Sequence, residues 1–301
     1  MKVLITGATG LVGTELSTLL INNGITVHYL TTSTKKIESK PNFHGFYWNP
    51  QEGKIDENAL IGVDAIIHLA GANIAKRWTK AYKQEIIESR VLSANVLFNA
   101  LKKNPHQVQQ FISASGTAIY PDSDINIYDE NSAQIDAGFL SNVVLKWEES
   151  ADQFKLINIK VCKIRTGVVY AKQGGALAEI LKPIKLGIGS SFGSGNQIQS
   201  WIHLQDLANL YYFVLKNNSD GVYNAVAPDN VSDEKLTKTI AEILKKPLFM
   251  PNIPRFVMKL VLGEMHELLF SNKKIKSQKA INEGFIFKFP DIESALKNLL
   301  S

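Results

Sequence analysis

Thr6-Gly7-Ala8-Thr9-Gly10-Leu11-Val12-Gly13 is the stretch that decides the fold of this chain of 301 residues. It follows an apolar run that begins at Val3, and it opens a helical pattern that lasts until Asn23. The first glycine permits a tight turn, the second lets backbone approach a ligand, and the third lets the helix pack closely on the strand. Amides at the helix start offer hydrogen-bond donors and a favourable dipole to phosphate groups. A plain tight connection would also use glycines, but this position between strand and helix predicts a turn that binds a dinucleotide.

The rest of the chain alternates short apolar runs with longer helical patterns. We expect strands at 3–6, 26–30, 45–48, 64–69, 108–114, 158–165 and 221–225, and long helices at 79–103 and 139–154. Continuous apolar strands that alternate with helices indicate a parallel sheet covered on both faces. The predicted fold class is therefore α/β, a Rossmann-type doubly wound sheet, with its ligand site beyond the carboxyl ends of the strands.

Composition changes from residue 174 onward. Glycines gather between residues 174 and 200, which we expect to form an irregular excursion on the substrate side. Prolines at 247, 251, 254 and 290 interrupt helical runs after residue 231. We therefore expect a nucleotide-binding domain over 1–227, which includes the excursion, and a small, mostly helical C-terminal lobe over 228–301.

Composition and charge exclude several classes of protein. Hydrophobic residues make up 45% and charged residues 20% of the chain, as in ordinary globular proteins, and the net charge of +5 is spread rather than clustered. We expect no nucleic-acid partner, because no basic patch stands out. The single cysteine, Cys162, fits a core position and a reducing compartment. No leader, no membrane span and no metal-ligand spacing of histidines is recognisable, so we expect a cytoplasmic protein without membrane partner or metal.

The end of the second strand bears on the choice of dinucleotide. NAD-binding proteins place a carboxylate there, which accepts a hydrogen bond from the ribose 2′-hydroxyl. This chain has Thr31-Thr32-Ser33-Thr34-Lys35-Lys36 instead, with no carboxylate until Glu38. Hydroxyls and lysines suit a 2′-phosphate, which an acid would repel, so NADP(H) is favoured over NAD(H). A merely polar loop would have the same composition.

Seven short motifs, spread over essentially the whole chain, carry a resemblance to a known family. They are residues 7–13, 69–74 (Leu-Ala-Gly-Ala-Asn-Ile), 88–90 (Glu-Ser-Arg), 165–169 (Arg-Thr-Gly-Val-Val), 174–176, 193–197 (Gly-Ser-Gly-Asn-Gln) and 200–207 (Ser-Trp-Ile-His-Leu-Gln-Asp-Leu). The chain resembles the extended short-chain dehydrogenase/reductases. Within them it is similar to the NAD-dependent epimerase/dehydratase-like "epimerase family protein" branch, which has its own C-terminal domain.

The resemblance implies a set of cofactor-binding residues and, by analogy, a homodimer. Gly7 belongs to the turn, and Thr9, Gly10, Leu11 and Val12 would hold the pyrophosphate. Thr31 and Thr32 would lie at the adenosine phosphate, although many relatives have arginine at position 32. Leu69, Ala70 and Gly71 would line the adenine-ribose and the nicotinamide riboside. Glu85 and Arg90 match a Glu-x₄-Arg spacing of the branch; they fit cofactor contacts and an ordinary surface pair equally well, and five residues place them on different helix faces.

Catalysis is the point at which the chain departs from the superfamily. Its chemistry needs a Tyr-x-x-x-Lys pair and a Ser or Thr hydroxyl. Ser115 is the candidate hydroxyl, with Thr117 as a substitute. The helix that should carry the pair has Ser141 and Leu145 at the positions given by spacing, and Asn142 stands four residues before Lys146. The named branch shares this absence.

Three accounts of the chemistry remain open. Tyr120 could be the acid with Lys146 nearby, or simply a packed aromatic. Ser115 and ordered water could relay protons. The protein could also bind NADP without turnover, as a sensor or scaffold. His203 and Asp206 could form a dyad, but a structural role fits related folds better. We expect an NADP-dependent oxidoreductase or epimerase-like enzyme for a small hydroxyl or carbonyl compound, of which a sugar nucleotide is one example.

Overall fold

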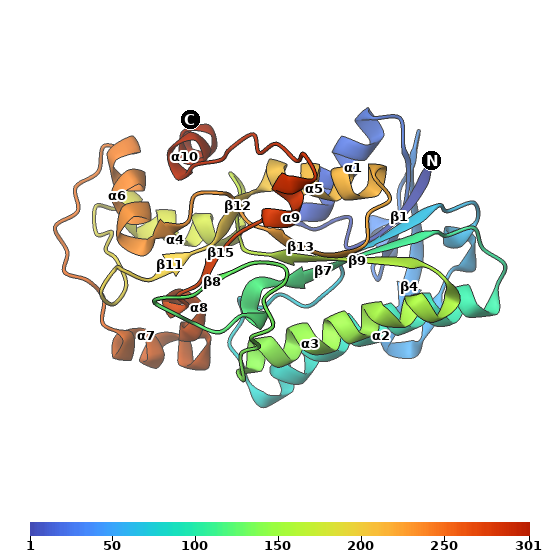
Figure 1. Cartoon of the computed structure of the whole chain (residues 1–301), viewed down its shortest axis with the longest axis horizontal. Coiled ribbons are helices and arrows are strands. Elements are labelled where there is room, and N and C mark those ends of the chain that lie inside the picture. The colour runs from blue at the N-terminus through green and yellow to red at the C-terminus, as the bar shows by residue number, and fades with distance from the viewer.

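A nine-stranded sheet forms the centre of the computed structural model, which describes residues 1–301 (Figure 1). Its strands are β1 (Lys2–Thr6), β2 (Thr26–Thr31), β3 (Ser39–Lys40), β4 (Phe43–Asn49), β5 (Lys54–Ile55), β6 (Ala65–His68), β7 (Gln110–Gly116), β9 (Lys160–Thr166) and β13 (Gly221–Ala225). The strand order is β13-β9-β7-β6-β1-β2-β4-β3, with β5 paired to β4. Every pair from β13 to β4 is parallel, and only β3 and β5 run antiparallel to β4.

Short strands and ten helices complete the chain. The small pairs are β10 (Val168–Tyr170) with β12 (Trp201–His203), β11 (Ile198–Gln199) with β14 (Val231–Ser232), and β15 (Lys274–Ile275) with β8 (Ile127–Tyr128). The helices are α1 (Leu11–Asn22), α2 (Lys80–Lys103), α3 (Phe139–Asp152), α4 (Gly175–Lys185), α5 (Leu204–Lys216), α6 (Asp233–Ile243), α7 (Arg255–Leu262), α8 (Glu267–Phe270), α9 (Gln278–Asn282) and α10 (Ile292–Leu300). No helix is both long enough and apolar enough to cross a membrane.

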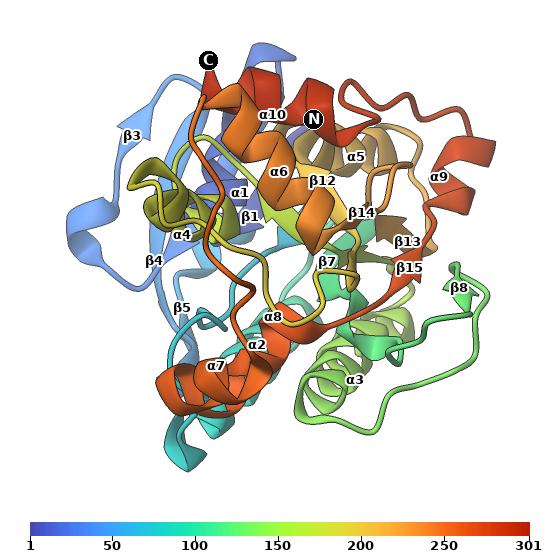
Figure 2. The same cartoon turned by 90° about the vertical axis from the view of Figure 1, so that its left-hand side faces the viewer.

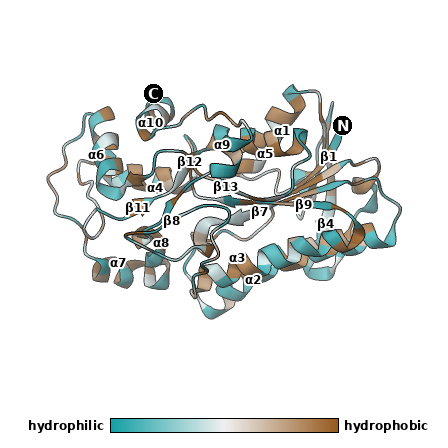
Figure 3. Ribbon diagram, viewed as in Figure 1, coloured by the Kyte–Doolittle hydropathy of each residue, from teal (hydrophilic) through white to brown (hydrophobic).

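Helices cover both faces of the sheet, as continuous apolar strands require. α1 and α5 lie above it in Figure 1, and α2 and α3 lie below. One core, which includes Ile5 and Tyr211, fills the upper layer, and a second, which includes Phe111 and Phe154, fills the lower layer. Apolar residues follow the central strands, whereas α2 and α3 alternate between apolar and polar faces (Figure 3). The predicted doubly wound α/β fold is confirmed.

The strand order reverses next to β1. From β1 the chain moves to β2 on one side and later returns to β6 on the other. In open sheets of this kind, the carboxyl ends of two such strands leave a crevice between their loops, where ligands bind. The glycine turn 7–10 follows β1, and the loop 69–72 follows β6, so both border this crevice.

The expected irregular excursion over 174–200 is wrong in its first half. Residues 175–185 form helix α4, whose residues Leu177, Leu181 and Ile184 are buried. Their spacing is that of an amphipathic helix, but the flanking glycines and Pro183 outweighed it in the sequence. After α4 the chain is irregular until β11, and Gly187, Gly193 and Gly195 there have positive φ.

The C-terminal residues pack against the rest of the molecule rather than apart from it. Figure 2 shows α6, α7 and α10 at the end of the molecule that also holds α4. A third core joins Leu181 and Trp201 to Ile240 and Leu296. Phe287 belongs to the main core beside α5. The segments on the two sides of residue 227 therefore share cores.

Candidate functional site

The glycine turn has the backbone geometry that a phosphate-binding turn needs. Gly7 has a φ of 74°, a left-handed conformation that favours glycine. The amide of Gly10 donates to the carbonyl of Gly7 over 3.0 Å. A Cβ on Gly13 would lie 2.2 Å from that same carbonyl oxygen, so only glycine lets α1 approach β1 this closely. Each of the three glycines therefore occupies a position where a side chain is excluded or crowded.

The start of α1 is open to a ligand. Gly10 is its N-terminal cap, and no side chain accepts a hydrogen bond from the first amides of the helix. Thr9 and Gly10 are exposed, and Leu11 and Val12 are half-buried. Free amides at an exposed helix start are the donors that an anionic diphosphate requires. The residues present thus fit the phosphates of a dinucleotide.

A buried hydrogen-bond chain fixes the loop after β6 beside this turn. The amides of Leu69 and Ala70 donate to Oγ1 of Thr6, each over 3.1 Å. The same hydroxyl contacts Nδ1 of His68 at 2.8 Å, and Nε2 of His68 contacts the hydroxyl of Ser93 at 3.1 Å. Burial lowers the pKa of His68 to about 4, so the ring is neutral near pH 7. Both ring nitrogens of His68 are engaged by hydroxyls, so His68 helps to hold the loop in place.

The end of β2 presents hydroxyls and cations. Thr31 is buried and accepts a hydrogen bond from the amide of Ser33, whereas Thr32 is exposed. Lys35 and Lys36 follow on an exposed single turn over Thr34–Lys36. The first carboxylate, that of Glu38, is paired with Lys40 at the surface. This edge of the crevice therefore carries positive charge without an acid at the strand end.

The two candidates on α2 lie in opposite environments. Glu85 is exposed, and Arg90 is 7% exposed. The Arg90 guanidinium donates to the carbonyls of Ile86 and Ala72, over 2.8 and 3.3 Å. The sequence predicted that Glu85 and Arg90 lie on different faces of α2. In the structure only Arg90 faces the loop after β6.

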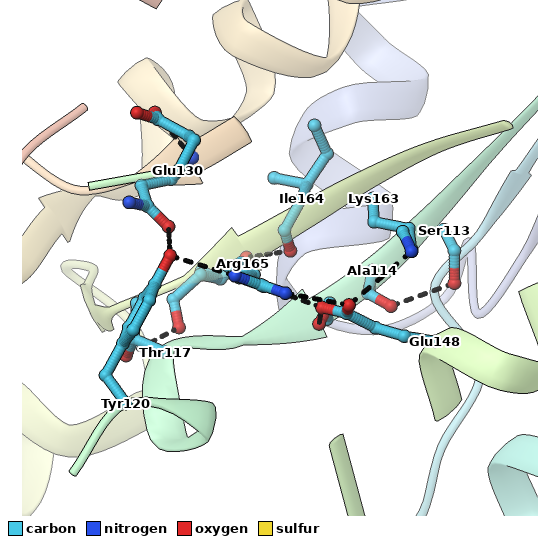
Figure 4. Close-up of polar contacts among 12 residues, drawn as sticks. Ser113, Ala114, Thr117, Tyr120, Glu130, Glu148, Lys163, Ile164 and Arg165 are labelled. Carbon is cyan, nitrogen blue, oxygen red and sulfur yellow. Dashed lines mark hydrogen bonds and ion pairs between the residues drawn. The ribbon is translucent and has the colours of Figure 1, made fainter. Parts of the chain in front are cut away.

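Glu148, Lys163, Arg165 and Tyr120 form a buried network of charged and polar side chains (Figure 4), which Ser115 joins through Glu148. The hydroxyl of Ser115 donates to Oε1 of Glu148 over 2.7 Å, and Ser115 is 4% exposed. Arg165 holds both oxygens of Glu148, with Nε at 2.8 Å and Nη2 at 2.9 Å. Lys163 lies 3.6 Å from the same carboxylate. Burial raises the pKa of Glu148, but the arginine, the serine and the lysine lower it more, so the pKa is below its usual value.

Tyr120 is the far end of this network and is closed to solvent. Its hydroxyl accepts from Nη1 of Arg165 at 3.0 Å and lies 2.9 Å from Oδ1 of Asn224. The ring is 0% exposed and stacks on Tyr128. Burial raises the pKa of Tyr120 above its ordinary value despite Arg165. Tyr120 is a packed aromatic here.

Lys146 does not approach Tyr120 or Ser115. It is exposed and lines a surface groove of about 540 Å³ between α2 and α3, together with Glu88 and Glu149. The structure therefore does not form the suggested Tyr120–Lys146 pair, because Lys146 and Glu148 are two residues apart and lie on opposite faces of α3, with Lys146 exposed and Glu148 buried. At the positions that spacing assigns to the superfamily pair, Ser141 is fully buried without a hydrogen-bond partner and Leu145 is half-buried.

Sequence reasoning missed the role of Glu148, Lys163 and Arg165. One signal was present: Lys163 and Arg165 interrupt an otherwise apolar strand at a spacing of two, which places both on one face of the sheet. Two cations on a buried face require an anion, and α3 supplies it. Thr117, the substitute hydroxyl, is half-buried at the end of β7 and reaches only the carbonyl of Thr166, at 3.4 Å.

His203 and Asp206 do not form a dyad. Nδ1 of His203 accepts from the amide of Gln205 and caps α5, and its ring packs on Phe289 at 3.9 Å. The carboxylate of Asp206 accepts from the amides of Lys288 and Phe289, over 2.8 and 2.9 Å. Both side chains tie the C-terminal segment to α5, which is the structural role.

Fold and site together define a nucleotide-binding protein of the epimerase class. The model of the "NAD dependent epimerase/dehydratase family" matches residues 3–226, and that of a "Domain of unknown function (DUF1731)" matches residues 253–299. The chain belongs to the NAD-dependent epimerase/dehydratase family, whose members bind NAD(P). The expected family and its C-terminal domain are confirmed.

Several relatives match the chain over its full length. The human "Epimerase family protein SDR39U1" is 33% identical over 311 residues, which cover 100% of both chains. "Epimerase family protein YfhF" of Bacillus subtilis is 32% identical and covers 100% of this chain and 98% of its own. A crystal structure of human SDR39U1 (isoform 2) with NADPH superposes with a TM-score of 0.87, at 31% identity and 99% coverage of each chain. A UDP-glucose 4-epimerase from Thermus thermophilus shares the fold with a TM-score of 0.78 at 16% identity, covering 100% of this chain and 99% of its own.

Proposed function

We propose that this protein binds NADP(H) in preference to NAD(H) at the crevice between the glycine turn and the loop after β6. The observation that carries this proposal is the end of β2, where two threonines and two lysines stand and no carboxylate faces the crevice. A 2′-phosphate gains from these groups, and a bare 2′-hydroxyl lacks its usual acceptor. The NADPH in the human SDR39U1 structure is consistent with the same preference.

Thermal unfolding with added nucleotide tests this preference. A ligand that binds only the native state raises the melting temperature, and at equal concentration the tighter ligand raises it more. We expect a larger rise with NADPH than with NADH at equal concentration. Replacement of Lys35 and Lys36 by glutamate should reduce the NADPH shift and spare the NADH shift. Equal shifts in the wild type would contradict the preference, and no shift with either would contradict nucleotide binding.

We further propose that the protein is an oxidoreductase for a small compound with a hydroxyl or carbonyl group. The cofactor supplies or accepts the hydride when bound. The chain supplies the turn that holds the diphosphate, the rigid loop after β6, and the hydroxyl of Thr117 at the end of β7. The buried hydroxyl of Ser115 donates to the carboxylate of Glu148 over 2.7 Å, whereas the half-buried hydroxyl of Thr117 makes only a long contact of 3.4 Å with the carbonyl of Thr166. Thr117 is therefore the protein group best placed to orient a substrate oxygen.

A screen of carbonyl compounds for NADPH oxidation tests the enzyme. We expect turnover with at least one compound, a large loss in Thr117→Val, and no loss in Lys146→Ala, since Lys146 faces the outer groove. Retained activity in Thr117→Val would remove the role of that hydroxyl.

A second function has an observation in its favour. Ser115 and Tyr120 are buried and committed to other side chains, and Lys146 lies elsewhere, so no proton-transfer group of the superfamily type lines the crevice. This arrangement favours an NADP-binding sensor or scaffold without turnover. A protein that binds NADPH tightly and stays inert across the whole panel would support it.

A further inference from the structure

Arg90 is a buried cation without an anion. It is 7% exposed, its only hydrogen bonds are to the carbonyls of Ile86 and Ala72, and its Nε has no partner. Burial lowers the pKa of Arg90 to about 10, with no carboxylate among the groups that influence it, so it stays charged near pH 7. The other arginine of comparable burial, Arg165, is held by both oxygens of Glu148.

Gly71 and Trp147 pack against the guanidinium of Arg90. One side of the guanidinium lies against Gly71, where a Cβ would be 3.0 Å from Cζ. Arg90 also lies over the ring of Trp147, 4.6 Å from its centroid. Its positive charge reaches the end of β6, since it helps burial to lower the pKa of His68. A buried, unpaired cation is costly and is expected to serve a ligand or a charge balance at such a position.

The loop that covers Arg90 follows β6, which lies on the side of β1 away from β2. A dinucleotide lies across the strand reversal, with its adenosine half over β2 and its other half over β6 and β7. The oxidised nicotinamide ring carries a positive charge and the reduced ring carries none. The phosphates have the same charge in both forms, so their attraction to Arg90 cancels when the two affinities are compared.

We propose that Arg90 makes this site select the reduced form of the cofactor over the oxidised form. Its charge, kept in a medium of low dielectric constant behind Gly71, repels the oxidised ring and leaves the reduced ring unaffected. Arg90 is therefore a specificity-determining residue, and the protein in solution carries NADPH rather than NADP⁺. This inference rests on the proposed binding of NADP(H).

Calorimetric titration of the full chain with NADPH and with NADP⁺ tests the proposal. The measured quantity is the ratio of the two dissociation constants, Kd for NADP⁺ divided by Kd for NADPH. We expect a ratio well above one for the wild type. Arg90→Met, which keeps most of the apolar stem, should lower the ratio by about fivefold or more, the change expected for one unit charge in a partly buried site. Arg90→Lys should keep most of the ratio.

Lys102→Met is the matched control, because it removes an exposed cation from the last turn of the same helix. It should leave the ratio unchanged. An equal loss of both affinities in Arg90→Met would make Arg90 a phosphate anchor and overturn the proposal, as would an unchanged ratio. If Arg90→Met does not fold, the wild-type ratio decides, and a value near one overturns the proposal. Absence of binding of both nucleotides to the folded wild type would instead refute the proposed function.

Discussion

Replacement of Gly13 by alanine should damage folding and cofactor binding together. The new Cβ would lie 2.2 Å from the carbonyl oxygen of Gly7 and 2.6 Å from Cα of Ala8, and both are backbone atoms that cannot rotate away. Ordinary contacts need more than 3 Å, so α1 must retreat from β1 by about 1 Å. Overpacking of this kind costs about 1–3 kcal/mol, against a gain of about 1 kcal/mol from the better helix propensity of alanine.

Urea denaturation and calorimetry with NADPH measure the two effects separately. We expect the free energy of unfolding to fall by about 1 kcal/mol and the affinity for NADPH to fall by about tenfold or more, since the amides of α1 move away from the diphosphate. Gly10→Ala is the first comparison: its Cβ would lie 3.3 Å from the Gly7 carbonyl, so stability should hold while affinity falls.

Gly24→Ala is the second comparison, at the other end of α1. Gly24 has a φ of 73° with open space around its Cβ position. Alanine there costs about 1 kcal/mol from the left-handed conformation and should leave NADPH affinity intact. The reasoning fails if Gly13→Ala unfolds at the wild-type urea concentration, or if Gly24→Ala weakens NADPH binding as much as Gly13→Ala does.

Three further predictions concern buried polar side chains. Glu148→Gln leaves Arg165 buried without its anion, so the free energy of unfolding, measured by urea denaturation, should fall by about 3–5 kcal/mol. The double variant Glu148→Met with Arg165→Met should recover much of this loss. A double variant no more stable than Glu148→Gln would contradict this reasoning. The pKa of His68, lowered by burial to about 4, predicts that stability is steady above pH 6.5 and falls by about 3 kcal/mol between pH 6.5 and pH 4, because the unfolded chain takes up the proton first. Denaturation at several pH values should show a shallower slope for His68→Gln, and identical slopes would argue against this residue as a source. Asp206→Ala leaves the amides of Lys288 and Phe289 without acceptors. The free energy of unfolding should fall by about 2 kcal/mol, and proteolysis near residue 288 should become faster. An unchanged cleavage rate would show that other contacts hold this segment.

Local patterns were enough to predict the main elements. The apolar run from Val3 gave β1, and β13 lies where its sequence predicted it, at Gly221–Ala225. The predicted helix over 79–103 is α2, which begins at Lys80 with Thr79 as its cap. A helix buried along one stripe shows a periodic pattern of apolar residues, and a strand buried on both faces shows a continuous apolar run. Both patterns can be recognised in the sequence. Helix α4 was missed because glycines on both sides of it hid a short amphipathic repeat.

The contacts inside the site could not be predicted from sequence patterns. The bond between Ser115 and Glu148 joins residues 33 positions apart, and it depends on how α3 lies across β7. Spacing placed Glu85 and Arg90 on different faces of α2, but only packing decides which face is buried. The sequence suggested that Tyr120 and Lys146 could act as a pair. In the structure Tyr120 is buried in the core and Lys146 is exposed to solvent.

The ties between Asp206, His203 and residues 288–298 bear on how the chain matures during synthesis. Phe285 and Phe287 complete the core beside α5, and β15 pairs with β8, whose residues precede it by nearly half the chain. Contacts between such distant residues form late, because a long loop must close first. A ribosome that has made only the first 227 residues therefore displays a sheet with an unfinished upper layer. The upper layer is complete only when Phe285 and Phe287 have packed beside α5.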